Sequence, residues 1–173
     1  SKYSREDGVL YYEGEPVNVT PADNAVEFAD IQGHWAEEAI AATVEDGLFA
    51  GTSDSTFSPE ESVNRGMAIT VIGRSALAVG APVYASETFE DVAYSDYFAP
   101  YVGWAVQQGI VQGTSATTFE PAATITREEL AVMLTNYIEK TGKTLPSVNE
   151  PAAYADAGAI SSWALDAVDK MQT

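Results

Sequence analysis

Two arginines stand at equivalent places in a repeated pattern. The chain holds only four arginines, and 62 residues separate Arg65 from Arg127 (127 − 65 = 62). Both are expected just inside the N-terminus of a helix, where the helix dipole disfavours a cation by roughly a few tenths of a kcal/mol. One interpretation is an ion pair with a neighbouring carboxylate, for which 26 acidic residues offer many partners. The other is an anion site, in which the guanidinium acts together with free helix N–H groups.

The two arginines are the last residues of two long copies of one pattern, residues 28–65 and 89–127. The offset is 62 at the arginines and 61 at the opening phenylalanines (89 − 28 = 61), so the second copy has one extra residue near Tyr94. A third copy begins at residue 154 and runs to residue 173. A unit of this size cannot bury its apolar face alone, so we expect neighbouring copies to share a core.

Each copy predicts a helix, a tight loop and a second helix. Apolar spacing predicts a first helix from His34 to about Asp46, with counterparts in the other two copies. In the first two copies this helix should end at Gly47 and Gly109, because glycine suits the left-handed position after a helix. Glycine, serine and proline then mark two loops, residues 51–59 and 113–121.

The second helices have recognisable starts. Asn64 is a capping residue at the first, and Thr126 with Glu129 forms a capping box at the other. The helix after Asn64 is apolar all round, which predicts that it is the most buried one. Residues 141–151 should form a linker. Ahead of the repeats, alternation within residues 8–19 predicts a β-hairpin turning at Glu13 and Gly14.

Composition excludes several functions. The formal net charge of −18 argues against nucleic acid, since phosphate contacts need clusters of Lys and Arg. No apolar run reaches 18 residues, so no membrane insertion is expected. The chain has no cysteine, no EF-hand spacing, no P-loop and no facing pair of acids such as a glycosidase needs. We therefore expect no enzyme, no metal site and no cofactor.

The motifs resemble the S-layer homology repeat. The order is F-x-D-(V/I), an aromatic opening a short helix, a glycine loop, F-x-P and then T-R-E-E. In copy one it is carried by Phe28, Asp30, Trp35, Gly47, Gly51, Phe57, Pro59 and Arg65. In copy two it is carried by Phe89, Asp91, Tyr97, Gly109, Gly113, Phe119, Pro121, Thr126, Arg127 and Glu129. Copy one keeps its arginine but loses the threonine and the glutamate.

The resemblance implies a mainly α-helical fold, in which helix-loop-helix repeats pack as a pseudo-threefold bundle with the third repeat incomplete. Repeats are then expected at 26–83, 84–145 and 146–173, after an N-terminal arm or hairpin at 1–25. A missing segment or another chain would complete the third repeat.

The resemblance also implies a function. It predicts a non-covalent anchor at the cell surface of a Gram-positive-type bacterium, bound to a secondary cell-wall polysaccharide that is anionic and often pyruvylated. The alternative is a structural module that assembles a surface layer through protein–protein contacts without binding glycan.

The expected carbohydrate-binding residues follow from these motifs. A pyruvyl carboxylate would meet Arg65 or Arg127. Three aromatic residues occupy equivalent positions at the start of the first helices, and they either pack in the core or groove wall or offer a platform to a sugar ring: Trp35, Tyr97 and Trp163. Gly51 and Gly113 are turn residues first, and a close approach of their backbone to a ligand is the second interpretation.

Overall fold

The computed structural model describes residues 27–77, 89–144, 146 and 153–172, and the backbone of three short strands ahead of them. Two compact units divide the chain, one from Ser1 to Pro59 and the other from Glu60 to Thr173. The boundary falls inside the first sequence repeat, between its loop and its second helix. The mainly α-helical repeat fold is confirmed, and the pseudo-threefold arrangement stays a prediction.

The N-terminal segment contains a three-stranded antiparallel sheet in the order β1-β2-β3. Its strands are β1 (Tyr3–Glu6), β2 (Val9–Tyr12) and β3 (Glu15–Pro16). β2 pairs with β3 across the predicted turn, with Tyr12 opposite Glu15. β1 was not predicted; it pairs with β2 so that Tyr3 faces Tyr12. The hairpin residues beyond Pro16 lie outside the described part of the chain.

In the first unit, the short helix η1 (Ala29–Ile31) leads to α1 (Glu37–Glu45). α1 begins three residues later than predicted, because His34 accepts hydrogen bonds at the preceding turn. Its carbonyl oxygen receives the N–H of Glu37, and its Nδ1 receives the N–H of Ala36. A small core follows, formed by the buried side chains of Phe28, Ile31 and Ile40 with the partly buried Ala36, Val44 and Phe57. Gly47, two residues after the end of α1, has the predicted left-handed backbone with a φ of 71°.

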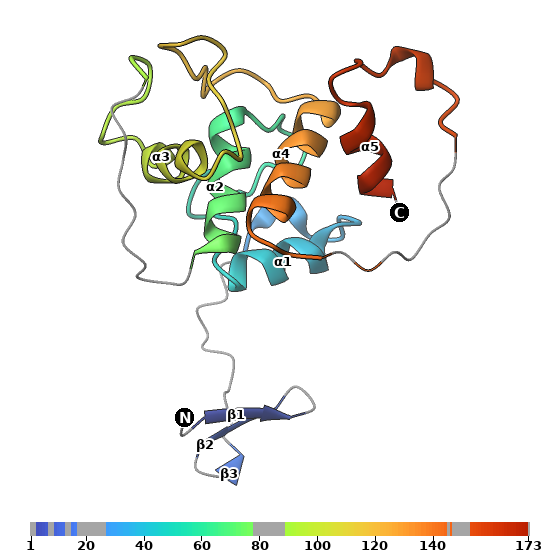
Figure 1. Cartoon of the computed structure of the whole chain (residues 1–173). Coiled ribbons are helices and arrows are strands. Elements are labelled where there is room, and N and C mark those ends of the chain that lie inside the picture. The colour runs from blue at the N-terminus through green and yellow to red at the C-terminus, as the bar shows by residue number, and fades with distance from the viewer. Residues whose placement is uncertain are drawn as a thin grey trace. The chain divides into compact units, whose positions relative to one another are not determined.

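The second unit places four helices side by side in the order α3, α2, α4, α5 (Figure 1). They are α2 (Arg65–Ala76), α3 (Ala99–Gln107), α4 (Arg127–Lys140) and α5 (Leu165–Gln172), with the short helix η2 (Ala157–Ala159) ahead of α5. As predicted, α2 buries more residues than any other described helix. Both predicted caps are confirmed: Asn64 accepts from the N–H of Met67, and Thr126 with Glu129 makes the complete capping box.

α2 and α3 approach closely because α2 presents glycines to the aromatic side chains of α3. A Cβ atom added to Gly73 would lie 2.4 Å from Cδ1 of Tyr101, and one added to Gly66 would lie 3.0 Å from Cδ1 of Phe98. No real side chain tolerates the first distance. The two rings therefore fill the space that the glycines leave open.

The contact between α4 and α5 reverses this division of large and small residues. Offsets of 62 and 66 place Thr135 at the position of Gly73 and Ala167 at the position of Tyr101 (73 + 62 = 135; 101 + 66 = 167). Ala164, at the position of Phe98, is fully buried, and Ala167 is nearly so. The first helices α3 and α5 are thus matched in bulk to α2 and α4, the second helices on which they pack.

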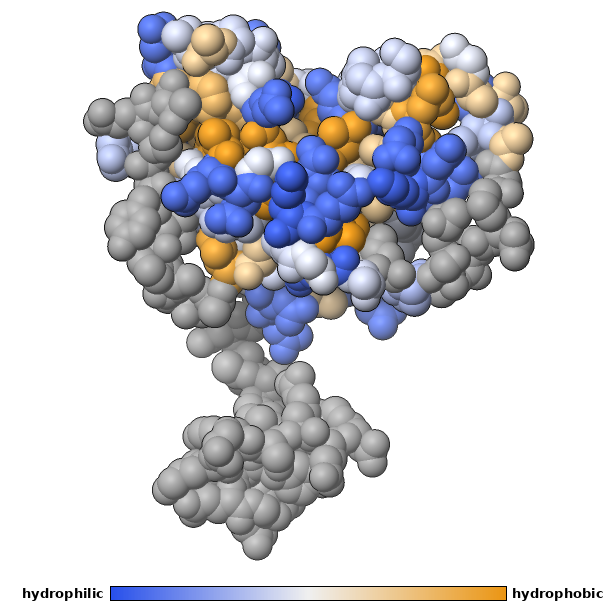
Figure 2. Space-filling model, viewed as in Figure 1, coloured by the Kyte–Doolittle hydropathy of each residue, from blue (hydrophilic) through white to orange (hydrophobic). Residues whose placement is uncertain are grey.

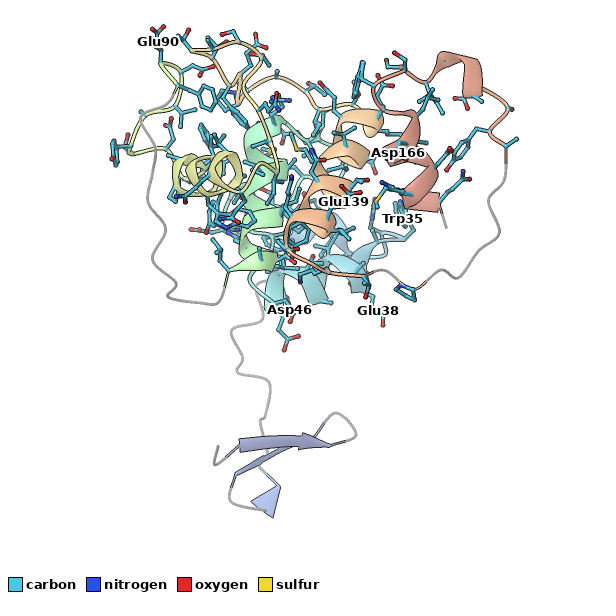
Figure 3. All side chains as sticks on the ribbon, viewed as in Figure 1. Trp35, Glu38, Asp46, Glu90, Glu139 and Asp166 are labelled. Atoms are coloured by element: carbon cyan, nitrogen blue, oxygen red, sulfur yellow. The ribbon has the colours of Figure 1, made fainter. Side chains whose placement is uncertain are left out.

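Polar contacts fasten α5 to α4 at both ends. The Glu128 carboxylate accepts two hydrogen bonds from Ser161, from its N–H and its hydroxyl, both at 2.9 Å. At the other end the Lys170 ammonium lies 2.7 Å from Glu139 and 2.8 Å from Asp166, which raises the pKa of the lysine. Figure 2 shows the hydrophilic side chains over α4 and α5, and Figure 3 labels Glu139 and Asp166 there.

The tight approach of α2 to α3 can be tested by adding one methyl group. We expect Gly73→Ala to lower the free energy of unfolding by about 1–3 kcal/mol, because overpacking outweighs the better helix propensity of alanine. Gly158→Ala is the control, since nothing lies within 4 Å of its added Cβ, and it should change stability by less than about 0.5 kcal/mol. Denaturant unfolding measures both, and an equal effect of the two substitutions would contradict the packing described.

Candidate functional site

Arg65, the first residue of α2, is buried in the loop of the second repeat. Its Nε donates to the carbonyl oxygen of Phe119 at 3.0 Å, and its Nη2 donates to that of Gln112 at 3.2 Å. The guanidinium carbon lies 4.7 Å from the centre of the Phe119 ring, and only 8% of the arginine is exposed. Main-chain carbonyl dipoles and the ring thus offset the unfavourable helix dipole.

This placement corrects both interpretations of Arg65. Its partners among the described residues are backbone carbonyls rather than a carboxylate, and its guanidinium lies in the interior rather than at an open groove edge. The helix N–H groups beside it are also used, because the N–H of Arg65 donates to Ala123 and that of Gly66 donates to Pro121. Arg65 therefore joins the first repeat to the second.

Arg127 occupies the equivalent first position of α4 and is exposed. Within the described part of the chain, no hydrogen bond or ion pair engages its guanidinium. The two acids that follow it are already used: Glu128 holds Ser161, and Glu129 closes the capping box. Arg127 is therefore available to an external anion in a way that Arg65 is not.

The three equivalent aromatic residues are all exposed, at 90% for Trp35, 54% for Tyr97 and 58% for Trp163. Each lies just ahead of its helix instead of on the buried face. Trp35, labelled in Figure 3, has its ring 5.6 Å from that of His34, and the Tyr97 ring meets the edge of Phe98 at 5.1 Å. Packing in the core is therefore excluded for all three side chains.

Of these aromatic residues, the two in the second unit are each related to an arginine: Tyr97 feels the charge of Arg74, and Trp163 lies at the helix end that carries Arg127. Ser161, two residues before Trp163, is bound to Glu128, so Trp163 and Arg127 lie at the same end of the α4–α5 pair. Partial burial raises the pKa of Tyr97, and the positive charge of Arg74 opposes part of that rise. The sequence did not single out Arg74, because its counterpart in copy two is Asn136 (74 + 62 = 136).

The two predicted loop glycines are explained by the interior of each loop. An added Cβ would lie 2.3 Å from the Phe28 ring at Gly51 and 2.4 Å from the Phe89 ring at Gly113. At both positions it would also approach two carbonyl oxygens of the loop within 2.6 Å. The packing of each loop by itself explains why glycine is required at these positions, without any ligand.

An aspartate holds each loop in the same way. Both oxygens of Asp30 accept from the N–H of Phe57, at 2.9 and 3.1 Å, and one accepts from that of Ser58 at 2.7 Å. Asp91 accepts from the N–H groups of Phe119 and Glu120 at 2.9 and 2.7 Å. These bonds stabilise an unusual backbone, because the residue after each phenylalanine has a positive φ, 61° at Ser58 and 57° at Glu120.

Neither a membrane span nor a metal centre is found in the described part of the chain. Of the helices described, none combines the length and apolar character needed to cross a bilayer. Across the same residues, no group of three histidine, cysteine or acidic side chains is placed to hold a metal ion.

Comparison with known proteins identifies the repeats. The family model of the S-layer homology domain matches residues 27–68 and 88–131. The chain contains two S-layer homology domains. These domains place the chain at the cell surface or cell wall, and they are anchoring modules rather than catalytic ones.

Relatives share this region with the chain while differing elsewhere. A surface-layer 125 kDa protein of Lysinibacillus sphaericus is 32% identical over 75% of the chain and 11% of its own length. An endoglucanase of Bacillus sp. (strain KSM-635) is 32% identical over 85% of the chain and 15% of its own length. A cellulosome-anchoring protein of Acetivibrio thermocellus is 26% identical over 82% and 33% respectively. The chain thus spans a third or less of each of these relatives.

The different settings of the two arginines predict different effects on stability. We expect Arg65→Ala to lower the free energy of unfolding by about 2–4 kcal/mol, because it orphans two carbonyl groups and uncovers Phe119. Arg127→Ala, the equivalent substitution at an exposed position, should change it by less than about 0.5 kcal/mol. Equal losses in denaturant unfolding would show that Arg127 is also structural.

The bond from Asp30 to its loop predicts a dependence on pH. The N–H groups of Phe57 and Ser58 lower the pKa of Asp30, so its stabilising contribution is present above the unfolded pKa of about 3.9 and is lost as pH falls through the folded pKa. We expect Asp30→Asn to be less stable than the parent chain at pH 6, with the gap closing towards pH 2. Thermal unfolding across this range measures the gap, and a constant gap would refute the assignment.

Proposed function

We propose that the chain anchors its protein to the cell wall by binding an anionic secondary cell-wall polysaccharide. The observation that carries the proposal is the exposure of Trp35, Tyr97 and Trp163 at the same position of three repeats. Exposed large rings that recur at the same point of three repeats mark a candidate contact surface for a partner. Aromatic rings combine a large apolar face with little conformational entropy to lose, which suits them to stacking on sugars.

Arg127 is the reason for proposing that the glycan is anionic. A guanidinium binds a carboxylate through two parallel hydrogen bonds, and Arg127 makes no bond within the described chain that would compete with them. A pyruvyl ketal places a carboxylate directly on a sugar ring, so one sugar could stack on Trp163 while its acid meets Arg127. This agrees with the names of the relatives, which include a cellulosome-anchoring protein and S-layer proteins.

The net charge of −18 makes the local cation necessary. An anionic polymer is repelled by the surface as a whole, and only a contact well within the screening length of about 8 Å can reverse this repulsion. Binding should therefore depend on single side chains rather than on the general field of the protein.

The proposal is tested by sedimentation with purified wall sacculi, before and after acid extraction of the polysaccharide. The parent chain should sediment only with unextracted walls. Trp163→Ala and Arg127→Ala should each weaken retention by about tenfold, the effect of losing one charge-assisted or stacking contact. Tyr94→Ala is the matched control, because Tyr94 is an aromatic residue outside the repeated pattern that is 66% exposed, compared with 58% for Trp163. Sedimentation that survives extraction would overturn the proposal.

A further inference from the structure

The turn that carries Trp35 is closed by the side chain of the residue before it. Nδ1 of His34 accepts the N–H of Ala36 at 3.1 Å, so Trp35 lies within the ring that this bond closes. Ala36 is the N-cap residue of α1, and no side chain at that position caps the helix. The start of α1 therefore depends on His34 rather than on a capping side chain of its own.

His34 holds the same turn through its backbone. Its N–H donates to the carbonyl oxygen of Ile31 and its carbonyl oxygen accepts the N–H of Glu37, both at 2.9 Å. The imidazole ring lies 5.6 Å from the Trp35 ring, with an angle of 34° between the two planes. The histidine thus fixes the backbone that carries Trp35 and lies against its ring.

Only one protonation state of the imidazole makes the bond to Ala36. A ring nitrogen accepts an N–H only while it carries no proton, so Nδ1 must be bare and the proton must lie on Nε2. Once Nδ1 is protonated, two donors face each other and the bond is lost. Histidine is the side chain whose charge ordinarily changes between pH 5 and 8, and His34 is the only histidine in the chain.

Two carboxylates lie beside this turn. The pKa of Asp30 in η1 is lowered mainly by the backbone N–H groups that it accepts, and the charge of His34 adds a smaller part. Glu37 of α1 accepts the N–H of Gly33 at 2.7 Å. Because carboxyl groups as a class titrate near pH 4, a charged His34 is offset by negative charge beside it rather than offered to an anionic glycan.

The second repeat holds its equivalent turn with a different group. An offset of 62 places Asp96 at the position of His34 (34 + 62 = 96). Its carboxylate accepts the N–H of Ala93 at 2.8 Å, and its carbonyl oxygen accepts the N–H of Ala99 at 3.0 Å. A carboxylate ordinarily remains an acceptor down to about pH 4. The turn ahead of Tyr97 therefore lacks the sensitivity that a histidine gives to the turn of the first repeat.

We propose that His34 is a positioning residue for Trp35, and that its protonation breaks the bond to Ala36 and loosens the turn at the start of α1. The aromatic ring of the first repeat is held in place at neutral pH and released in acid, whereas the ring of the second repeat is held throughout. Where Trp35 serves as a sugar platform, which rests on the proposed function, wall retention through the first repeat weakens as pH falls.

The loosening of the turn is measured without glycan, by NMR relaxation of the isotope-labelled chain. Backbone order parameters of Trp35 and Ala36 should fall from about 0.85, the value of a rigid backbone, towards about 0.6 between pH 8 and pH 5. The amide of Ala93, held by Asp96, is the internal control and should keep its order. An Ala36 resonance that shifts with pH while its order stays constant would overturn the inference, because only the charge of His34 would then change.

His34→Asn is the matched variant, because asparagine accepts the N–H two residues further on without gaining a proton in this range. Its turn should stay ordered from pH 8 to pH 5. His34→Ala, which has no acceptor, should be loose at both values. An asparagine variant that loosens in acid as the parent chain does would assign the change to another group and overturn the inference.

Sedimentation with wall sacculi separates this inference from the proposed function. Retention of the parent chain should fall about tenfold from pH 8 to pH 5, the effect of losing one stacking contact, and His34→Asn should keep its retention. If Trp35→Ala binds walls as the parent does, the proposed function fails for the first repeat, and the order parameters still decide the role of His34. If Trp35→Ala weakens binding while the parent and His34→Asn lose the same retention in acid, the inference is overturned and the proposed function stands.

Discussion

The guanidinium of Arg65 is the interaction on which the second unit depends. Arg65 is the first residue of a helix of the first sequence repeat, and its side chain reaches the loop of the second repeat. There the guanidinium donates to two carbonyl groups and covers the Phe119 ring. A cation at a helix N-terminus is unfavourable by itself. It becomes favourable here because the loop directs carbonyl dipoles at it. Asp91 in turn holds that loop in a backbone conformation that would otherwise be strained.

This contact explains why the compact units do not follow the sequence repeats. The division at Pro59 and Glu60 separates the first half of repeat one from its second helix. That helix belongs physically to the next repeat, through Arg65 at one end and the glycine-to-aromatic contact with α3 along its length. A repeat of this chain is thus a unit of sequence, while the unit of packing spans the junction between two repeats.

Burial and exposure also distinguish the roles of the repeated residues. The aromatic residues ahead of the first helices are left outside every described core, whereas the phenylalanines and glycines of the loops are used in packing. Of the two equivalent arginines, one is bound within the fold and the other is exposed. Equivalence in sequence therefore marks equivalent geometry but leaves open whether a partner within the chain has already filled it.

The sequence by itself determined the repeat, the helix-loop-helix order, the caps at Asn64 and Thr126 and the glycine ends of the first helices, because these depend on residues within a few positions of one another. Only the tertiary structure decided that Arg65 is buried, that Trp35, Tyr97 and Trp163 are exposed, and that Gly51 and Gly113 serve their own loops. The burial of Arg65 depends on a bond across 54 positions of the chain, and the need for glycine at Gly51 depends in part on a ring 23 positions away (51 − 28 = 23). A local pattern carries no information about which distant carbonyl or ring will be there.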